Sequence, residues 1–280
     1  RDAFSRRDAI PPPARRPGHP PLVVATIARG SSDHAASYLG YLLMHRLGLW
    51  VTSLPMSLVT LYKSPLQCRH VLALALSQSG QSPDLIAPLA QLRRGGARTV
   101  AMVNAGDSPL ALAAQTVLPL RAGPEQSVAA TKSYIAQLVA SARLLAQWQL
   151  DGPLTEALHR LPEDLAYAAA LDWTPAIEPL IEAERLFVIG RGPCLAVAEE
   201  AALKFKETCG IAAEAFSSAE VKHGPMALIE EGYPLLVFAP RGPAQAGLLA
   251  LAEEMRLRGA KVLLAAPAGA PGANLPIVET

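Results

Sequence analysis

The sequence predicts an α/β protein of two tandem modules, each a parallel sheet flanked by helices in the doubly wound, flavodoxin-like manner. Short apolar, β-branched runs alternate with longer Ala- and Leu-rich stretches of helical period. The same order of segments then recurs in the second half of the chain. With 280 residues, 51% of them hydrophobic and 18% charged, the chain can bury the cores of two modules of ordinary size.

The expected strands are apolar runs of the kind that parallel sheets bury on both faces. They are Leu22–Ile27, Val71–Leu76, Thr99–Val103, Leu186–Ile189, Leu235–Phe238 and Lys261–Leu264. The expected helices lie between them, near Asp33–Leu47, Pro83–Arg93, Val128–Leu150, Ala196–Thr208 and Ala244–Arg258. A helical connector over Thr155–Glu184 would join the two modules.

The repeat rests on three pairs of similar segments offset by about 163 residues. They are "LVVATIARG" with "LFVIGRG", "GARTVAMVNAG" with "GAKVLLAAPAG", and the run at Val71–Leu76 with that at Leu235–Phe238. Parallel-sheet proteins share an Ala-, Leu- and Val-rich composition, but composition alone would not fix one offset. We therefore expect a Pro- and Arg-rich lead-in over 1–20, a first module over 21–150, the connector over 151–185 and a second module over 186–280.

Composition and charge argue against several classes of protein. A net charge of +1 without a basic stripe argues against a nucleic-acid binder. Cys68, Cys194 and Cys209 show neither the spacing of metal ligands nor the even count of a disulfide framework, which favours a reducing compartment. The sequence shows no signal peptide and no membrane-spanning run. We expect a cytoplasmic protein without a metal, a cofactor or a membrane partner.

A candidate phosphate-binding loop follows the expected strand at Val71–Leu76. The segment "SQSGQSPD" begins at Ser77, and Ser82, Pro83 and Asp84 suit the N-cap and first turn of a helix. A phosphate at such a helix start would meet free backbone N–H groups, the positive end of the helix dipole and several hydroxyl donors. No Lys follows as in a nucleotide-binding P-loop, so a small monophosphate fits better than a nucleoside triphosphate. The alternative is a surface turn, for which Ser, Gly and Pro clusters are typical.

Two further segments could complete a pocket. Ser31 and Ser32 follow the first expected strand, at the end of a parallel strand where ligands bind. The segment "GPEQSVAATK" places small residues and Thr131 at the start of another helix. Taken singly, each is better explained as a plain helix cap than as a ligand contact.

The second module carries candidate acid–base residues. Glu200, Lys204 and Glu207 are spaced so that they share one face of a helix. An exposed ladder of ion pairs would show the same spacing. His223 follows in the Gly- and Pro-containing segment "VKHGP", where a surface histidine is the alternative interpretation. Spacing alone leaves these roles open.

Three segments together resemble the sugar isomerase (SIS) family. They are "SQSGQSPD", "GPEQSVAATKSYIAQL" and "ALKFKETCGIAAEAFSSAEVKHGPMALI". In this order they are similar to the isomerase half of glucosamine-6-phosphate synthase, and closer still to its free-standing deaminase and isomerase relatives. The resemblance covers about Leu22 to Glu279.

The resemblance implies a role for each matching residue. Phosphate contacts would come from Ser77, Gln78, Ser79 and Ser82, and sugar contacts from Ser31, Ser32, Val128 and Ala129. Glu207 would be the base that moves a proton between C1 and C2, with Lys204 beside the substrate's oxygens. His223 would assist ring opening from the partner subunit, which implies a homodimer with a shared active site.

The implied activity is deamination and isomerisation of an amino-sugar 6-phosphate, with glucosamine 6-phosphate as the leading substrate. The synthase's glutaminase domain begins with a cysteine nucleophile, whereas this sequence begins at Arg1 and its first cysteine is Cys68, so we expect no glutamine-dependent synthesis. The family's leading helix and a tail lysine also have no counterpart, because "IPPPARRPGHPP" stands first and no Lys follows Lys261. The alternatives are a fructosamine-6-phosphate deglycase or other phosphosugar isomerase, and a non-catalytic sugar-phosphate sensor.

Overall fold

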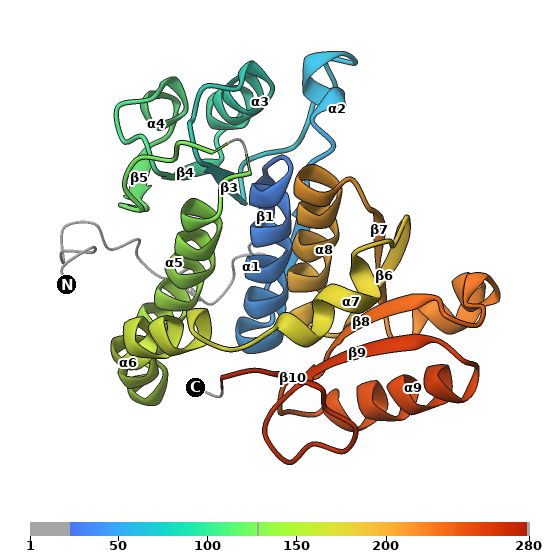
Figure 1. Ribbon diagram of the computed structural model, residues 1–280. Coiled ribbons are helices and arrows are strands. Elements are labelled where there is room, and N and C mark those ends of the chain that lie inside the picture. Colours follow the sequence, from blue (N-terminus) through green and yellow to red (C-terminus); the bar gives the residue numbers. More distant parts are fainter. Residues whose placement is uncertain (1–22, 128, 279–280) are drawn as a thin grey trace. The chain divides into compact units, whose positions relative to one another are not determined.

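The computed structural model describes residues 23–127 and 129–278 and divides the chain into two compact units, the first ending at Thr155 and the second beginning at Glu156. Each unit contains one five-stranded parallel sheet with helices packed against it (Figure 1). The α/β class and the two parallel sheets expected from the sequence are therefore confirmed.

The first unit alternates strands and helices along the chain. Its elements are β1 (Val23–Ile27), α1 (Ser31–Leu47), β2 (Trp50–Ser53), α2 (Ser57–Thr60), β3 (Val71–Ser77), α3 (Pro83–Arg94), β4 (Arg98–Val103), α4 (Pro109–Ala113), β5 (Thr116–Pro119) and α5 (Lys132–Gln149). The strand order is β2-β1-β3-β4-β5, and every pairing is parallel. From β1 the chain adds β2 on one side, and from β3 it adds β4 and β5 on the other, so the carboxyl ends of β1 and β3 form the topological switch point of the sheet.

The alternation of side chains along β3 builds the two halves of this unit's core. Leu72, Leu74 and Leu76 pack with residues of α1 and α5 on one face of the sheet. Ala73 and Ala75 pack with residues of α3 and α4 on the other face. Successive side chains of a strand point to opposite faces, so an uninterrupted apolar run is needed to bury both.

The second unit repeats this plan. After α6 (Gly152–Ala169) come a 3-10 helix (Thr174–Ala176), α7 (Ile177–Leu180), β6 (Arg185–Gly190), α8 (Cys194–Lys204), a π-helical turn (Phe205–Cys209), β7 (Ala212–Ser217), two 3-10 turns (Glu220–His223 and Pro225–Leu228), β8 (Pro234–Phe238), α9 (Gln245–Leu257), β9 (Lys261–Ala266) and β10 (Leu275–Pro276). Its strand order, β7-β6-β8-β9-β10, matches that of the first sheet. In the central pairs, Val23 lies opposite Val71 and Phe187 opposite Leu235, 48 residues on in both cases. The repeat in the sequence is thus a repeat of topology.

The structure also corrects some expected boundaries and adds elements. The helix expected near Val128–Leu150 begins at Lys132, and the one expected near Ala196–Thr208 changes to a π-helical turn at Phe205. The strands β2, β5, β7 and β10 were not expected. They lie at or beside the sheet edges and are short or partly exposed, so they carry no continuous apolar run.

Candidate functional site

The segment expected to bind phosphate is a loop between a buried strand and a helix start. β3 ends at Ser77, and α3 begins at Pro83 with Ser82 as its N-cap in an extended conformation. The Ser82 hydroxyl makes no capping hydrogen bond to the helix backbone. Pro83 carries no N–H, and the Leu85 and Ile86 N–H groups donate to the Ser82 carbonyl, so among the described contacts the Asp84 N–H is the one in this first turn left for water or a ligand. The strand–loop–helix arrangement predicted from the sequence is confirmed.

Two serines hold the shape of the loop. The Gly80 N–H donates to Ser77 Oγ at 2.9 Å, and the Gln81 N–H donates to Ser79 Oγ at 3.3 Å. Ser77 is buried, whereas Gln78, Ser79 and Ser82 are partly exposed. A serine oxygen that accepts one hydrogen bond still carries its own O–H group as a donor. The loop therefore presents hydroxyl donors on a backbone that its own hydrogen bonds shape.

Gly80 is the position at which the loop tolerates no side chain. Its φ is +63°, and a Cβ there would lie 2.1 Å from Ser108 Oγ. Ser108 is the N-cap of α4, where its Oγ accepts from the Ala111 N–H. The Leu110 N–H also donates to the Gly80 carbonyl at 3.1 Å. The loop is thus packed directly against the start of α4.

The first strand brings Ser31 and Ser32 to the same edge of the sheet. β1 and β3 pair in parallel, so their carboxyl ends and the loops that follow are neighbours. Both serines lie in the first turn of α1 and are partly exposed. Gln137 of α5, which the sequence did not single out, donates from Nε2 to Ser32 Oγ at 2.9 Å. This amide is almost completely buried, and it fixes the Ser32 oxygen while leaving the hydroxyl proton free to donate.

The third expected contact segment leads into α5. The Ser133 N–H donates to Glu125 Oε1 at 2.9 Å, so Glu125 caps this helix from within the loop. Thr131 stands at the N-cap position without a capping bond, and its hydroxyl donates to the Ala129 carbonyl at 3.3 Å. No hydrogen bond joins Ala129 or Thr131 to the loop at Ser77–Ser82 within the described residues. Val128 lies outside the described residues.

In the second unit, Lys204 links the two carboxylates expected to share its helix face. Lys204 Nζ lies 2.5 Å from Glu207 Oε2 and 3.5 Å from Glu200 Oε1. The side chains of Glu200, Lys204 and Glu207 are 8%, 24% and 37% exposed. A plain surface ladder would expose all three, whereas this cluster becomes more exposed from Glu200 to Glu207. The arrangement presents one carboxylate toward solvent beside a fixed ammonium group.

Glu207 lies on a π-helical turn rather than on the α-helix proper. α8 ends at Lys204, the turn Phe205–Cys209 follows, and Gly210 ends it with φ +70°. Such turns are rare in proteins, and those that occur are often found at functional sites, because the extra residue changes the direction of the side chains that follow. The helical spacing in the sequence did not reveal this turn.

His223 lies at the end of the 3-10 turn Glu220–His223, and its side chain is exposed. Its neighbour Lys222 forms an ion pair with Glu254 at 2.5 Å. No hydrogen bond or ion pair joins His223 to Lys204 or Glu207 within the part of the chain that the structure describes. A role for His223 therefore does not follow from contacts within one chain.

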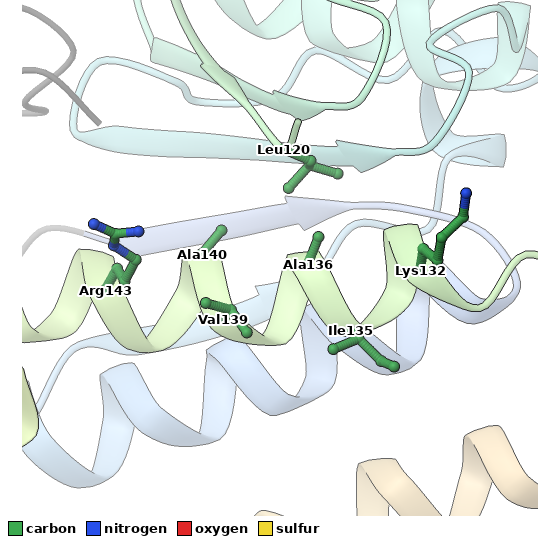
Figure 2. A pocket seen from close by; sticks show the side chains of 7 residues that line it. All are labelled: Leu120, Lys132, Ile135, Ala136, Val139, Ala140 and Arg143. Carbon is green, nitrogen blue, oxygen red and sulfur yellow. The ribbon is translucent and has the colours of Figure 1, made fainter. Parts of the chain in front are cut away.

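A hollow in the described residues lies on α5. It has a volume of about 310 Å³ and is lined by Leu120, Lys132, Ile135, Ala136, Val139, Ala140 and Arg143. Figure 2 shows Ala136 and Ala140 on the side of α5 that faces Leu120, Ile135 and Val139 farther from it, and Lys132 and Arg143 at the two ends of the row. None of the site residues expected from the sequence lines it. Across residues 23–127 and 129–278, no group of three or more His, Cys, Asp or Glu side chains could hold a metal ion, and no helix has the length and apolarity to cross a membrane.

Comparisons with known proteins agree with this description. Residues 23–146 and 179–266 match the model of the SIS domain. Glutamine–fructose-6-phosphate aminotransferase (isomerizing) of Thermus thermophilus is 37% identical over 258 residues, which are 88% of this chain and 42% of that relative. The corresponding enzyme of Corynebacterium glutamicum is 32% identical over 90% of this chain and 42% of its own length. The chain thus spans about two fifths of the length of these relatives.

Solved structures extend the likeness to the fold. A Silicibacter pomeroyi protein, assigned provisionally as a phosphosugar isomerase, has a TM-score of 0.85 and 45% identity, over 92% of this chain and 78% of that one. Glucosamine-6-phosphate deaminase of Thermotoga maritima has a TM-score of 0.76, over 91% of this chain and 78% of its own. At 24% identity, the second likeness shows the fold alone.

The packing of Gly80 predicts the effect of adding one methyl group. Gly80→Ala should lower the free energy of unfolding by about 1–3 kcal/mol, because alanine would hold a strained φ and displace Ser108. Gly106→Ala is the matched control in the same unit, since a Cβ there meets no atom within 4 Å and its change should stay within about 0.5 kcal/mol. Urea unfolding of both variants measures the difference. Equal stability of the two would show that the loop is not packed as described.

Proposed function

Because the chain belongs to the SIS domain family, we propose that it is a phosphosugar isomerase acting on an amino-sugar 6-phosphate. It converts glucosamine 6-phosphate and water to fructose 6-phosphate and ammonia. The observation that carries this proposal is the cluster in which Lys204 links the partly exposed Glu207 to the buried Glu200. A carboxylate beside a fixed cation is suited to moving a proton while charge develops on a neighbouring oxygen.

The chemistry requires one proton to move between two adjacent carbons. Once the sugar ring is open, Glu207 removes the proton from C2 and returns a proton to C1 through an enolamine. Lys204 stabilises the charge that develops on the substrate's oxygens. The resulting imine at C2 takes up water and releases ammonia, which leaves the ketose phosphate. His223 assists ring opening by transferring the proton between the ring oxygen and the C1 hydroxyl.

The first unit supplies the binding groups in this proposal. Ser77, Gln78, Ser79 and Ser82 bind the phosphate at the start of α3. The sugar is bound by the remaining candidates, Ser31, Ser32, Val128, Ala129 and Thr131. Gln137 supports this role for Ser32, because its amide keeps the Ser32 hydroxyl available as a donor.

The named relatives support the choice of substrate. The aminotransferases that match 88% or more of this chain are named for fructose 6-phosphate and for isomerisation, which concerns the same C1–C2 pair.

The three cysteines of the chain are free, which suits the reducing cytoplasm that we propose as the location of the protein.

Two other functions are separated from this one by assaying the products. A deglycase would release glucose 6-phosphate and an amine from a fructosamine 6-phosphate, without ammonia from glucosamine 6-phosphate. A sensor would bind sugar phosphates and turn none of them over. Ammonia and fructose 6-phosphate formed in equal amounts from glucosamine 6-phosphate support the proposal, and either of the other two results contradicts it.

We also propose that the enzyme is a homodimer whose two chains share each active site. The support is that the exposed His223 has no bond to Glu207 within the described chain, although the proposed chemistry uses both. Mixing inactive Glu207→Gln protein with inactive His223→Ala protein should restore part of the activity after subunit exchange. A monomer in light scattering, or no recovery after mixed dimers have been demonstrated, would rule out a shared site.

The role of Glu207 predicts a specific kinetic change. Glu207→Gln keeps the size of the side chain but removes the base, so turnover should fall about a hundredfold to ten-thousandfold while KM changes little. Glu253→Gln is the matched control, because Glu253 pairs with Arg256 at the same i,i+3 spacing on α9, outside the candidate site. Steady-state kinetics with glucosamine 6-phosphate measures both. Near-full turnover by a folded Glu207→Gln protein would show that another group is the base.

A further inference from the structure

Arg29 lies at the edge of the sheet where the phosphate loop begins. It follows β1, two residues after Ile27, and β1 pairs in parallel with β3, whose end carries the loop at Ser77–Ser82. Arg29 Nη2 lies 3.5 Å from Oδ2 of Asp84, in the first turn of α3. The ion pair therefore holds a guanidinium group beside the helix start at which the phosphate is proposed to bind.

The charge of Arg29 also reaches the helix that follows β1. Asp33 lies in the first turn of α1. Burial raises the pKa of Asp33, and the positive charges of His34 and Arg29 oppose that rise. Arg29 thus interacts with the first turns of both helices that begin at the switch point.

Packing does not explain why a cation stands here. The side chains of Arg29 and Asp84 are 61% and 57% exposed, and an ion pair so exposed stabilises a fold by at most about 1 kcal/mol. A helix N-terminus already carries partial positive charge, which favours anions and not cations. The residues Ser77–Ser82 include no charged side chain, so the loop itself offers a phosphate dianion no full counter-charge.

We propose that Arg29 is the cation that binds the substrate's phosphate. In the free protein Asp84 holds the guanidinium group in place, and the bound phosphate then replaces the Asp84 carboxylate as its partner. The proposal rests on the phosphosugar isomerase function. A guanidinium fork forms two parallel hydrogen bonds with phosphate oxygens, which the hydroxyls of the loop cannot replace. Arg29 would thus select phosphorylated sugars over their unphosphorylated forms.

Calorimetric titration of the full chain with fructose 6-phosphate and with inorganic phosphate tests this without turnover. Arg29→Gln should weaken both affinities about tenfold to a hundredfold, and Arg29→Lys should weaken them less. Asp84→Asn should strengthen both about twofold to fivefold, because it removes the competing carboxylate. Arg46→Gln is the matched control, since Arg46 pairs with Asp151 near the other end of α1 and should leave both affinities unchanged.

The two variants are expected to change the affinities in opposite directions, and this distinguishes phosphate binding by Arg29 from a purely structural role of its ion pair. Loss of a purely structural ion pair would change the affinities in the same direction in Arg29→Gln and Asp84→Asn, together with the melting temperature. If the unmodified protein binds fructose 6-phosphate and Ser79→Ala weakens it but Arg29→Gln does not, the inference about Arg29 fails and the proposed function stands. If the unmodified protein binds neither ligand, the proposed function fails, and the inference fails with it.

Discussion

The parallel pairing of β1 with β3 is the constraint on which the candidate binding site depends. Parallel strands end at the same edge of a sheet, so the loops after β1 and β3 become neighbours although Ile27 and Ser77 lie far apart in sequence. The pairing is secured by burial on both faces, with Leu74 packed on one side and Ala75 on the other. The N-termini of α1 and α3 both begin at this edge of the sheet, and helix N-termini favour an anion.

The second unit repeats this topology with different side chains. Its strand order repeats that of the first unit, but the helix that follows β6 carries carboxylates and a lysine, whereas its counterpart α1 begins with Ser31 and Ser32. The π-helical turn after Lys204 carries Glu207, whose side chain is the most exposed of the cluster. Both copies match the SIS domain, and in the proposed function the first copy would bind the substrate while the second would transfer the proton.

The sequence was most informative where burial was complete. The central strands were predicted closely, because an apolar run as short as Val71–Leu76, followed at once by Ser- and Gly-rich sequence, fits a buried strand better than a helix. Edge strands such as β2 were missed, since a half-exposed strand of four residues has no distinct pattern. The contacts of Ser32 with Gln137, and of Arg29 with Asp84, depend on tertiary pairing that no local spacing reveals. The roles of Glu207 and His223 came from the family resemblance and remain predictions.

The fate of the hydrogen at C2 tests the central claim, which is proton transfer between C1 and C2 by a protein base. Glucosamine 6-phosphate is converted in D2O, and the fructose 6-phosphate is examined by NMR while ammonia is measured in the same sample. The account predicts equal amounts of the two products, with solvent deuterium at C1 of the fructose 6-phosphate. The absence of both products, or ammonia formed without fructose 6-phosphate, would contradict it.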